Sequence, residues 1–451
     1  MRVPKVVKDF AVPFRAAGFQ CYLVGGAVRD MLMGRAHTDY DIATDALPEQ
    51  VTSLFRRVIP TGIKHGTVTV LFKDTRFEVT TFRTETGYSD GRRPDTVTFA
   101  PTIFDDLSRR DFTINALAYD LFADKIIDPH GGRKDVDARL IRAIGVPSER
   151  FSEDGLRPLR ACRIAAQLSF TIHEATLSAI PASLGVLAKV SAERIRDELL
   201  KTLESPMPSV GFFLMRDTGI LRVILPELLE GVGVEQGSLH CYDVFTHALS
   251  ACDAAPRASL VLRIAALLHD VGKPRTRGVA PDGHPTFYSH EKVSAEMAEE
   301  ILMRLKLPLE VVKNVSHLIA YHMFNYQEDW SDAAVRRLIA RVGELRIDDL
   351  MALRRADQIG MCRENAATFP QGLADFAARV HSVKQQGRAF SVRQLAADGN
   401  DIMATLDIPP GPVVGIILNE LLQAVLDDPA LNEREKLLEI ARRMHRERLG
   451  G

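Results

Sequence analysis

The sequence predicts an α/β domain over roughly the first 140 residues and an almost entirely helical chain after it. Two observations support this prediction. Short β-rich runs (QCYLVGG, YDIAT, TVTVLF and RFEVTTFR) alternate with Gly, Asp and Pro turns in the first part. From about residue 150, apolar residues recur at helical spacing in segments that begin after Ser, Asp or Pro. A chain of 451 residues is long enough for several such domains.

The elements follow in order along the chain. The N-terminal MRVPKVVKDFAVPFRAAGF has the spacing of an amphipathic helix, and PEQVTSLFRRV that of another. TVTVLF-KDT-RFEVTTFR is typical of a β-hairpin. In the second part we expect helices at DGLRPLRACRIAAQL, AERIRDELLKTL, SLVLRIAALLHDVG, SAEMAEEILMRL, DAAVRRLIARVG and PVVGIILNELLQAVL, with a loop at TRGVAPDGHPTFYSH.

Composition excludes several classes of protein. Apolar residues make up 46% and charged residues 26%, which is ordinary for a soluble globular protein, and no apolar run approaches the roughly 20 residues that span a bilayer. The N-terminus lacks the features of a signal peptide. The scattered cysteines form no CxxC, which predicts reduced thiols and a cytoplasmic location. With a net charge of −2, any nucleic-acid site must be a local basic patch.

The stretch YLVGGAVRDMLMGRAHTDYDIATDA contains the first candidate site. A strand runs into Gly25 and Gly26, which let the backbone approach a phosphate, and Arg29 follows one turn into the next helix. On a strand, Asp39 and Asp41 face the same side, so both carboxylates point into one cleft. Such a pair suits Mg²⁺ bound together with phosphate oxygens. Taken separately, each motif is more simply explained by structure: the glycines by a tight strand–helix turn, and the two acids by a surface acidic pair.

This stretch resembles the first motif of the tRNA nucleotidyltransferases (CCA-adding enzymes) and the related bacterial poly(A) polymerases. TGIKHGTVTV, FEVTTFRTETGYSDGRRPDTVTF, DDLSRRDFTINALAYD, IDPHGGRKDVDARLIRAIG and FSEDGLRPLRACRIAAQLSF resemble the later motifs in the family's order, from about residue 20 to 205. Ile164, where the family pattern has Phe, and Met33, in place of Leu, are departures that we expect to lie outside the chemistry. The resemblance implies a polymerase-β-like nucleotidyltransferase head followed by an all-α neck, an HD domain and a helical tail.

The resemblance also implies roles for individual residues. Asp39 and Asp41 would hold two metal ions, and Gly26 and Arg29 would bind the triphosphate. In RRDFTINA, Arg110 would contact the nucleotide and Asp111 would accept from a ribose hydroxyl, although RRD by itself is also typical of a solvated charge run. Glu78 is either a third carboxylate of the site or an ordinary acid on a strand surface.

A second motif predicts how the nucleotide is chosen. We expect Glu153, Asp154 and Arg157 to open one helix, on which Arg157, Arg160 and Arg163 recur every three residues along one side. A carboxylate accepts from the amino group that cytosine and adenine share, and a guanidinium donates to the adjacent ring nitrogen. Uracil and guanine present the reverse pattern and would leave buried polar groups unpaired. The alternative is a basic helix face with an acidic first turn.

The second half resembles the HD phosphohydrolase domain. DVFTHALSACDAA, LRIAALLHDVGKP and ALRRADQIG supply its H…HD…D ligands, which are His247, His269, Asp270 and Asp357. His290 and His322 match positions that some HD domains use around a second metal, and His317 lies off the pattern. These ligands suit Ni²⁺, Co²⁺ or Mn²⁺. A degenerate HD domain without catalysis is the alternative.

We therefore predict four segments: a nucleotidyltransferase head (1–145), a helical neck with the template motif (146–225), an HD domain (226–365) and a helical tail (366–451). The predicted substrates are ATP, CTP and the 3′ end of tRNA, with Mg²⁺ in the head and no membrane partner. A poly(A) polymerase, a CC-only or A-only enzyme, and a phosphohydrolase or RNA-binding regulator with a vestigial head stay open. The YSDGRRPD loop resembles that of enzymes that add the terminal A and favours full CCA addition. The basic tail LNEREKLLEIARRMHRERLGG either contacts phosphates or is a solvated helix.

Overall fold

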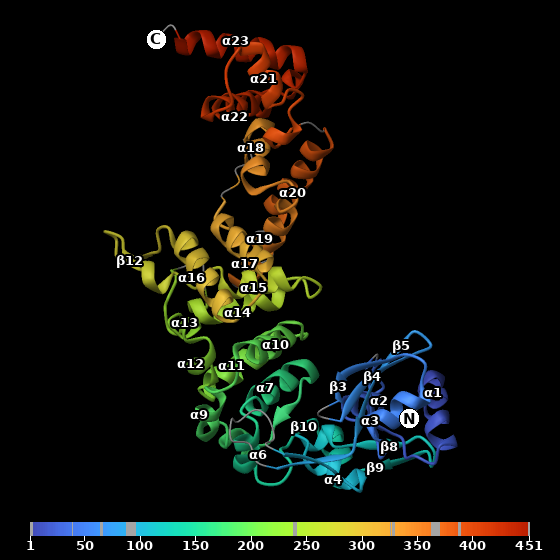
Figure 1. Cartoon of the computed structure of the whole chain (residues 1–451). Coiled ribbons are helices and arrows are strands. Elements are labelled where there is room, and N and C mark those ends of the chain that lie inside the picture. Colours follow the sequence, from blue (N-terminus) through green and yellow to red (C-terminus); the bar gives the residue numbers. More distant parts are fainter. Residues whose placement is uncertain are drawn as a thin grey trace. The chain divides into compact units, whose positions relative to one another are not determined.

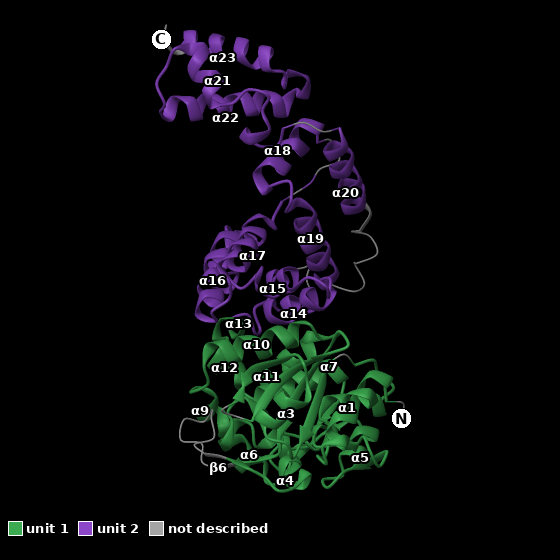
Figure 2. Ribbon diagram, turned by 45° about the vertical axis from the view of Figure 1, so that its right-hand side comes forward, with its two compact units in different colours: residues 1–229 green, residues 230–451 purple. Residues whose placement is uncertain are grey.

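The structure is a computed structural model that describes residues 3–37, 39–63, 66–86, 96–237, 241–324, 326, 330–361, 370–386 and 389–449 (Figure 1). The chain divides into two compact units, Met1–Leu229 and Glu230–Gly451 (Figure 2). In the part of the chain that is described, no helix is long and apolar enough to cross a membrane.

A seven-stranded mixed sheet forms the centre of the head, in the order β3-β4-β5-β2-β1-β8-β9. Its strands are β1 (Tyr22–Val24), β2 (Tyr40–Thr44), β3 (Val58–Gly62), β4 (Thr67–Phe72), β5 (Thr75–Thr81), β8 (Ala118–Asp120) and β9 (Lys125–Ile127). Only β2 and β5 pair in parallel, and the other neighbours are antiparallel. The predicted hairpin is β4–β5, whose two turn residues, Lys73 and Asp74, both have left-handed φ angles (47° and 60°).

The helices of the head are α1 (Lys5–Ala16), α2 (Gly26–Leu32), α3 (Pro48–Leu54), α4 (Ile103–Ser108) and α5 (Gly132–Asp137). The amphipathic α1 buries Phe10, whose ring stacks on Phe77 of β5 at 3.9 Å between centroids and on Phe55 at 4.7 Å. This aromatic packing anchors the N-terminal helix to the sheet. A separate strand pair is formed by β6 (Arg83–Thr86) and β7 (Thr96–Phe99).

The neck follows as short helices. They are α6 (Pro147–Glu153), α7 (Arg157–Leu168), α8 (Glu174–Ser178), α9 (Leu184–Leu187), α10 (Ala192–Leu203), α11 (Pro208–Asp217), α12 (Ile220–Ile224) and α13 (Pro226–Leu229). Helix α7 packs against α10 and α11. A minimal parallel pair joins β10 (Leu140–Ile141), which precedes the neck, to β11 (Thr171–Ile172), which follows α7.

The described residues of the second unit form helices and loops, apart from the two-residue strands β12 (Gly278–Val279) and β13 (Pro285–Thr286), which lie in the segment expected to be a loop. Its helices are α14 (Val244–Ala254), α15 (Leu260–Leu268), α16 (His290–Arg304), α17 (Leu309–Tyr321), α18 (Asp332–Val342), α19 (Ile347–Met361), α20 (Pro370–Gln385), α21 (Gly399–Leu406), α22 (Pro412–Asp427) and α23 (Arg434–Leu449). The predicted fold class, an α/β head followed by helical domains, is confirmed.

Candidate active site and metal-ligand cluster

Two carboxylates lie on the open face of the central strand β2. Asp39 directly precedes this strand and Asp41 is its second residue, while the intervening Tyr40 and the following Ile42 are buried. The alternation of the strand therefore exposes both acids to solvent. In the parallel neighbour β5, Glu78 is the register partner of Asp41. Three carboxylates consequently gather on one patch of the sheet.

The surroundings of Asp41 favour a bound cation. The side chain of Asp41 retains solvent contact, yet the protein around it removes enough water to raise the pKa of its carboxyl group. The positive charge of Arg110 opposes this rise, whereas the charges of Glu78 and Asp39 add to it. A divalent ion would relieve the repulsion among these acids.

The glycine turn and Arg29 lie beside the carboxylates. Gly25 has a φ of +71°, and a Cβ there would lie 2.9 Å from Nη1 of Arg110 and 3.7 Å from Oδ2 of Asp41. Only glycine therefore fits this turn without strain. Arg29 donates to Oδ1 of Asn115 at 2.7 Å and to Oδ1 of Asp30 at 2.8 Å, which fixes its guanidinium.

Asp111 is buried inside a hydrogen-bond network. It accepts from Nδ2 of Asn115 at 3.1 Å and from Nε of Arg160 at 2.8 Å. Burial alone would raise the pKa of Asp111, but Arg160 and the Asn115 hydrogen bond hold it well below its usual range. Asp111 thus links the RRD motif to helix α7 through Arg160. The spacing of residues in the sequence did not predict this contact.

The template motif is arranged differently from the prediction in one respect. Glu153 ends helix α6 and Asp154 follows in extended conformation, while Arg157 begins α7, so the expectation that all three open one helix is wrong. Pro158 explains the break, because proline is tolerated only in the first turn of a helix.

Contacts hold the template side chains in place. Arg157 donates to Oε2 of Glu153 at 2.5 Å and to the carbonyl of Arg109 at 3.1 Å. Oδ2 of Asp154 accepts from Arg194 of α10 at 2.9 Å. Arg163 donates to Glu198, also on α10, at 2.5 Å.

One cavity of 680 Å³ unites these groups. Its lining includes the predicted Gly25, Gly26, Arg29, Asp41, Arg110, Asp111, Asp154, Arg157, Arg160 and Arg163. Asp39 and Glu153 are predicted site residues outside this lining. Ile164, which we expected to lie away from the chemistry, is part of it, as are Glu78, Arg83, Arg109 and Asn115. The excess of arginines over carboxylates suits a polyphosphate ligand.

Sequence reasoning missed several groups of the pocket. Arg109 lies within the RRD motif and Asn115 within FTINA, and the sequence alone indicates a role for neither. Arg194 and Glu198 lie four residues apart on helix α10 and therefore on one face of it. Arg194 pairs with Asp154 and Glu198 pairs with Arg163. Acidic and basic residues are nearly equal in number along this helix, so its charge gave no signal of these contacts. The predicted YSDGRRPD loop lies outside the described residues.

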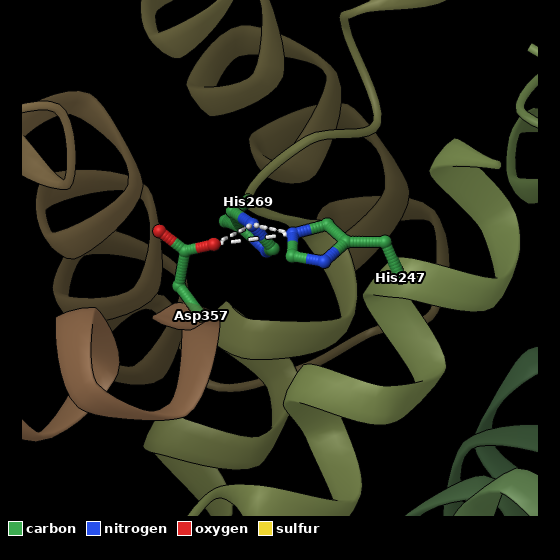
Figure 3. Close-up of side chains that lie close together, drawn as sticks. All are labelled: His247, His269 and Asp357. Atoms are coloured by element: carbon green, nitrogen blue, oxygen red, sulfur yellow. Dashed lines mark hydrogen bonds and ion pairs between the residues drawn. The ribbon is translucent and has the colours of Figure 1, made fainter. Parts of the chain in front are cut away.

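The second unit brings six predicted ligands together. His247, His269 and Asp357 converge from helix α14, the end of α15 and α19 (Figure 3). Nε2 of His247 lies 3.1 Å from Nε2 of His269 and 3.1 Å from Oδ1 of Asp357. A second group consists of His269, Asp270 and His322, and Nε2 of His290 lies 3.2 Å from Oδ1 of Asp270.

The outer hydrogen bonds suit these histidines to metal binding. Nδ1 of His269, His290 and His322 each lies 2.7–2.8 Å from a backbone carbonyl, which can only accept a hydrogen bond. In the neutral ring, Nε2 then keeps its lone pair and faces the cluster. Burial opposes a charge on His269, but the carboxylates of Asp270 and Asp357 raise its pKa to about 10, so a metal ion that binds its Nε2 must displace a proton. His317 lies off the cluster and contacts the carbonyl of Val342 at 2.6 Å.

Comparisons with known proteins agree with this architecture. Residues 21–142 match the poly A polymerase head domain, residues 169–231 the probable RNA and SrmB-binding site of polymerase A, and residues 238–361 the HD domain. Head, neck and HD domain together define a nucleotidyltransferase of the poly A polymerase class that carries an HD domain.

Relatives that align over nearly the whole chain identify the family within this class. The CCA-adding enzyme of Enterococcus faecalis is 33% identical over 446 residues, 98% of this chain and 97% of that enzyme. That of Lactiplantibacillus plantarum is 33% identical over 445 residues, 97% of this chain and 96% of its own length. The crystal structure of the Bacillus stearothermophilus CCA-adding enzyme in complex with CTP superposes with a TM-score of 0.77 at 29% identity and covers 100% of both chains. The chain belongs to the family of CCA-adding enzymes, which are tRNA nucleotidyltransferases.

Proposed function

We propose that the head adds cytidine and adenosine from CTP and ATP to the 3′ end of tRNA, with Asp39 and Asp41 holding two Mg²⁺ ions. The observation that carries this proposal is the single cavity in which Asp41, the arginines and the template pair Asp154–Arg157 meet. The bound CTP in the related structure at 29% identity supports the nucleotide assignment. The whole-length relatives favour CCA addition over poly(A), CC-only or A-only addition.

Different residues of the cavity would bind the triphosphate, the metal ions and the ribose. Gly25 and Gly26 let the backbone approach the triphosphate, and Arg29 and Arg110 neutralise its charge. The bound metal ions would activate the 3′-hydroxyl of the RNA and stabilise the departing pyrophosphate. Asp111, held by Arg160 and Asn115, orients the ribose.

Base choice rests on the Asp154–Arg157 pair. Asp154 accepts from the amino group of cytosine or adenine and Arg157 donates to the ring nitrogen. The contacts of these side chains with Arg194, Glu153 and the Arg109 carbonyl keep them from rotating to suit uracil or guanine. Each mismatched polar group would then cost about 1–3 kcal/mol.

The test is nucleotide incorporation. The purified chain is incubated with tRNA that lacks its 3′-CCA and with all four nucleoside triphosphates, and the products are sequenced. We expect two cytidines and one adenosine, and no addition when Mg²⁺ is removed by chelation. A poly(A) tail, a product that stops after CC, or no extension with Mg²⁺ present would each contradict full CCA addition by this chain.

We further propose that the HD cluster hydrolyses 2′,3′-cyclic or terminal phosphates with a bound Ni²⁺, Co²⁺ or Mn²⁺ ion. Two groups of possible ligands support this: His247, His269 and Asp357 form one, and His269, Asp270 and His322 form the other. A bound ion would lower the pKa of a coordinated water. Removing a damaged 3′ phosphate would expose the hydroxyl that the head extends. We expect the His269→Ala/Asp270→Ala variant to lose hydrolysis and to keep CCA addition. If no divalent ion elicits hydrolysis from the unmutated chain, the domain is a scaffold.

The predicted segments and the cytoplasmic location complete the proposal. The division into two units after Leu229 supports the boundary that we place between neck (146–225) and HD domain (226–365). The matched HD model over residues 238–361 supports the extent of that domain. Work on tRNA suits a cytoplasmic enzyme, and fractionation of the native cell tests this location.

A further inference from the structure

A buried carboxylate to which the sequence motifs assign no role binds two arginines of the active-site cavity. Asp106 lies on helix α4 and is fully buried. Its Oδ1 accepts from Nε and Nη2 of Arg109 at 3.0 and 2.6 Å. Its Oδ2 accepts from Nη2 of Arg110 at 3.1 Å. Each oxygen therefore holds one guanidinium, and both guanidinium-bearing residues line the cavity.

Arg110 extends from Asp106 to the carboxylates of the sheet. Its Nη1 is the atom nearest to a Cβ built on Gly25, at 2.9 Å, and Oδ2 of Asp41 is the next nearest, at 3.7 Å. The guanidinium of Arg110 thus lies between the buried Asp106 and the glycine turn that faces Asp41. Rotation of Arg110 away from Asp106 would move its charge out of this turn.

Arg109 connects Asp106 to helix α7, which carries Arg157. While its side chain is held by Asp106, its backbone carbonyl accepts from Nη2 of Arg157 at 3.1 Å. One buried carboxylate consequently fixes a segment that contacts both the phosphate side and the base-reading side of the cavity.

We propose that Asp106 is a positioning residue for nucleotide addition, which holds Arg109 and Arg110 as a clamp for the triphosphate of the incoming nucleotide. This inference rests on the proposed nucleotide transfer. Free arginine side chains lose much rotamer entropy when they bind a ligand, and a carboxylate that orders them beforehand removes that cost from binding. Stability alone explains the arrangement poorly, because an apolar side chain would fill the same space without desolvating a charge.

The chain offers a matched control in Asp135 of helix α5. This carboxylate is also buried, and its Oδ2 accepts from Oγ1 of Thr113 at 2.7 Å and from Nε of Arg142 at 3.1 Å. Asp135 and Arg142 are both absent from the lining of the cavity. Asp135→Asn therefore removes a buried charge of similar setting without touching the clamp.

The experiment measures steady-state kinetics for CTP and ATP on tRNA that lacks CCA, together with thermal unfolding of each variant. We expect Asp106→Asn to raise KM about tenfold or more with a smaller change in kcat, since it weakens hydrogen bonds to charged groups that order the clamp. Asp135→Asn should lower the unfolding temperature to a similar extent and change KM less than twofold. In an Arg110→Ala background, Asp106→Asn should raise KM less than it does in the unmutated chain.

The outcomes separate this inference from the proposed function. If the unmutated chain adds no nucleotide, the proposed function fails first. If it adds nucleotides and Asp106→Asn leaves KM unchanged, or if Asp135→Asn raises KM equally, the positioning role is overturned. An equal effect of Asp106→Asn in both backgrounds would also overturn it. Should the Asn variant be unfolded at the assay temperature, Asp106→Glu, which keeps the charge but displaces it, should raise KM, and an unchanged KM would refute the clamp.

Discussion

Glu198 offers a direct test of how the neck supports the template helix. This glutamate of α10 is 4% exposed in its side chain; its Oε2 lies 2.5 Å from Nε of Arg163 and its Oε1 lies 3.8 Å from Nη1 of Arg160. Glu198→Gln keeps the shape of the side chain and removes its charge. Arg163 then loses the carboxylate that its Nε contacts, and Arg160, which keeps its contact with Asp111, loses a more distant one.

The size of the effect follows from these contacts. A hydrogen bond to a charged group contributes about 1.5–3 kcal/mol, and glutamine retains one neutral acceptor, so we expect a loss of about 2 kcal/mol. In a unit of this size, that corresponds to a fall of about 4–8 °C in unfolding temperature. The release of Arg163 should also lower kcat/KM for CTP and ATP together, because both nucleotides use the same cavity.

The assay is thermal unfolding of the whole chain by circular dichroism, combined with nucleotide addition at a temperature at which every variant is folded. Glu193→Gln, at an exposed position in the first turn of the same helix, is the control and should change stability by about 0.5 kcal/mol or less. A Glu198→Gln variant that unfolds within 1 °C of the unmutated chain and keeps its kcat/KM would refute the reasoning.

Three further predictions concern the cavity itself. Arg157→Ala should raise misincorporation of UTP and GTP relative to CTP and ATP, measured by competition on one tRNA; a variant that is slower but equally selective would contradict base reading by Arg157. Gly25→Ala should lower addition at least tenfold in a folded protein, because its Cβ would collide with Arg110 at a φ of +71°; normal activity would show that the turn has room. The pKa of Asp111 is depressed in the folded chain, so its stabilising contribution is present above its unfolded pKa of about 4 and is lost as pH falls below that value. The stability difference between the unmutated chain and Asp111→Asn should therefore shrink from pH 5 to pH 2 in urea unfolding, and a constant difference would contradict the depressed pKa.

Local patterns account for most of what could be predicted. The alternation that turns Asp39 and Asp41 outward depends on a two-residue period, and the three-residue spacing of Arg157, Arg160 and Arg163 depends on helix geometry. Both are properties of a single element, so the sequence contains them directly. The glycine turn could also be predicted locally, because a left-handed backbone conformation at Gly25 is a property of the turn itself.

The partners of these residues could not be predicted in the same way. Arg29 pairs with Asn115, 86 residues later in the chain, and Arg163 with Glu198, 35 residues later. Such pairs depend on how sheet, loop and neck helices pack, and many arginines and acids in the sequence would satisfy the same local pattern. The break between α6 and α7 is different, because Pro158 indicates it in the sequence. Since proline fits only the first turn of a helix, α7 has to begin close to Pro158, which leaves Glu153 in the earlier helix.

The central claim is that the carboxylates beside the arginine-lined cavity carry out nucleotide transfer. It is tested most directly by the single-turnover rate of cytidine addition to tRNA lacking CCA, compared between the unmutated chain and Asp41→Ala. We predict rapid addition by the unmutated chain with Mg²⁺, and a loss of at least a thousandfold in the variant, which removes a metal ligand and no core contact. A folded Asp41→Ala variant that adds cytidine at a near-normal rate would contradict the claim.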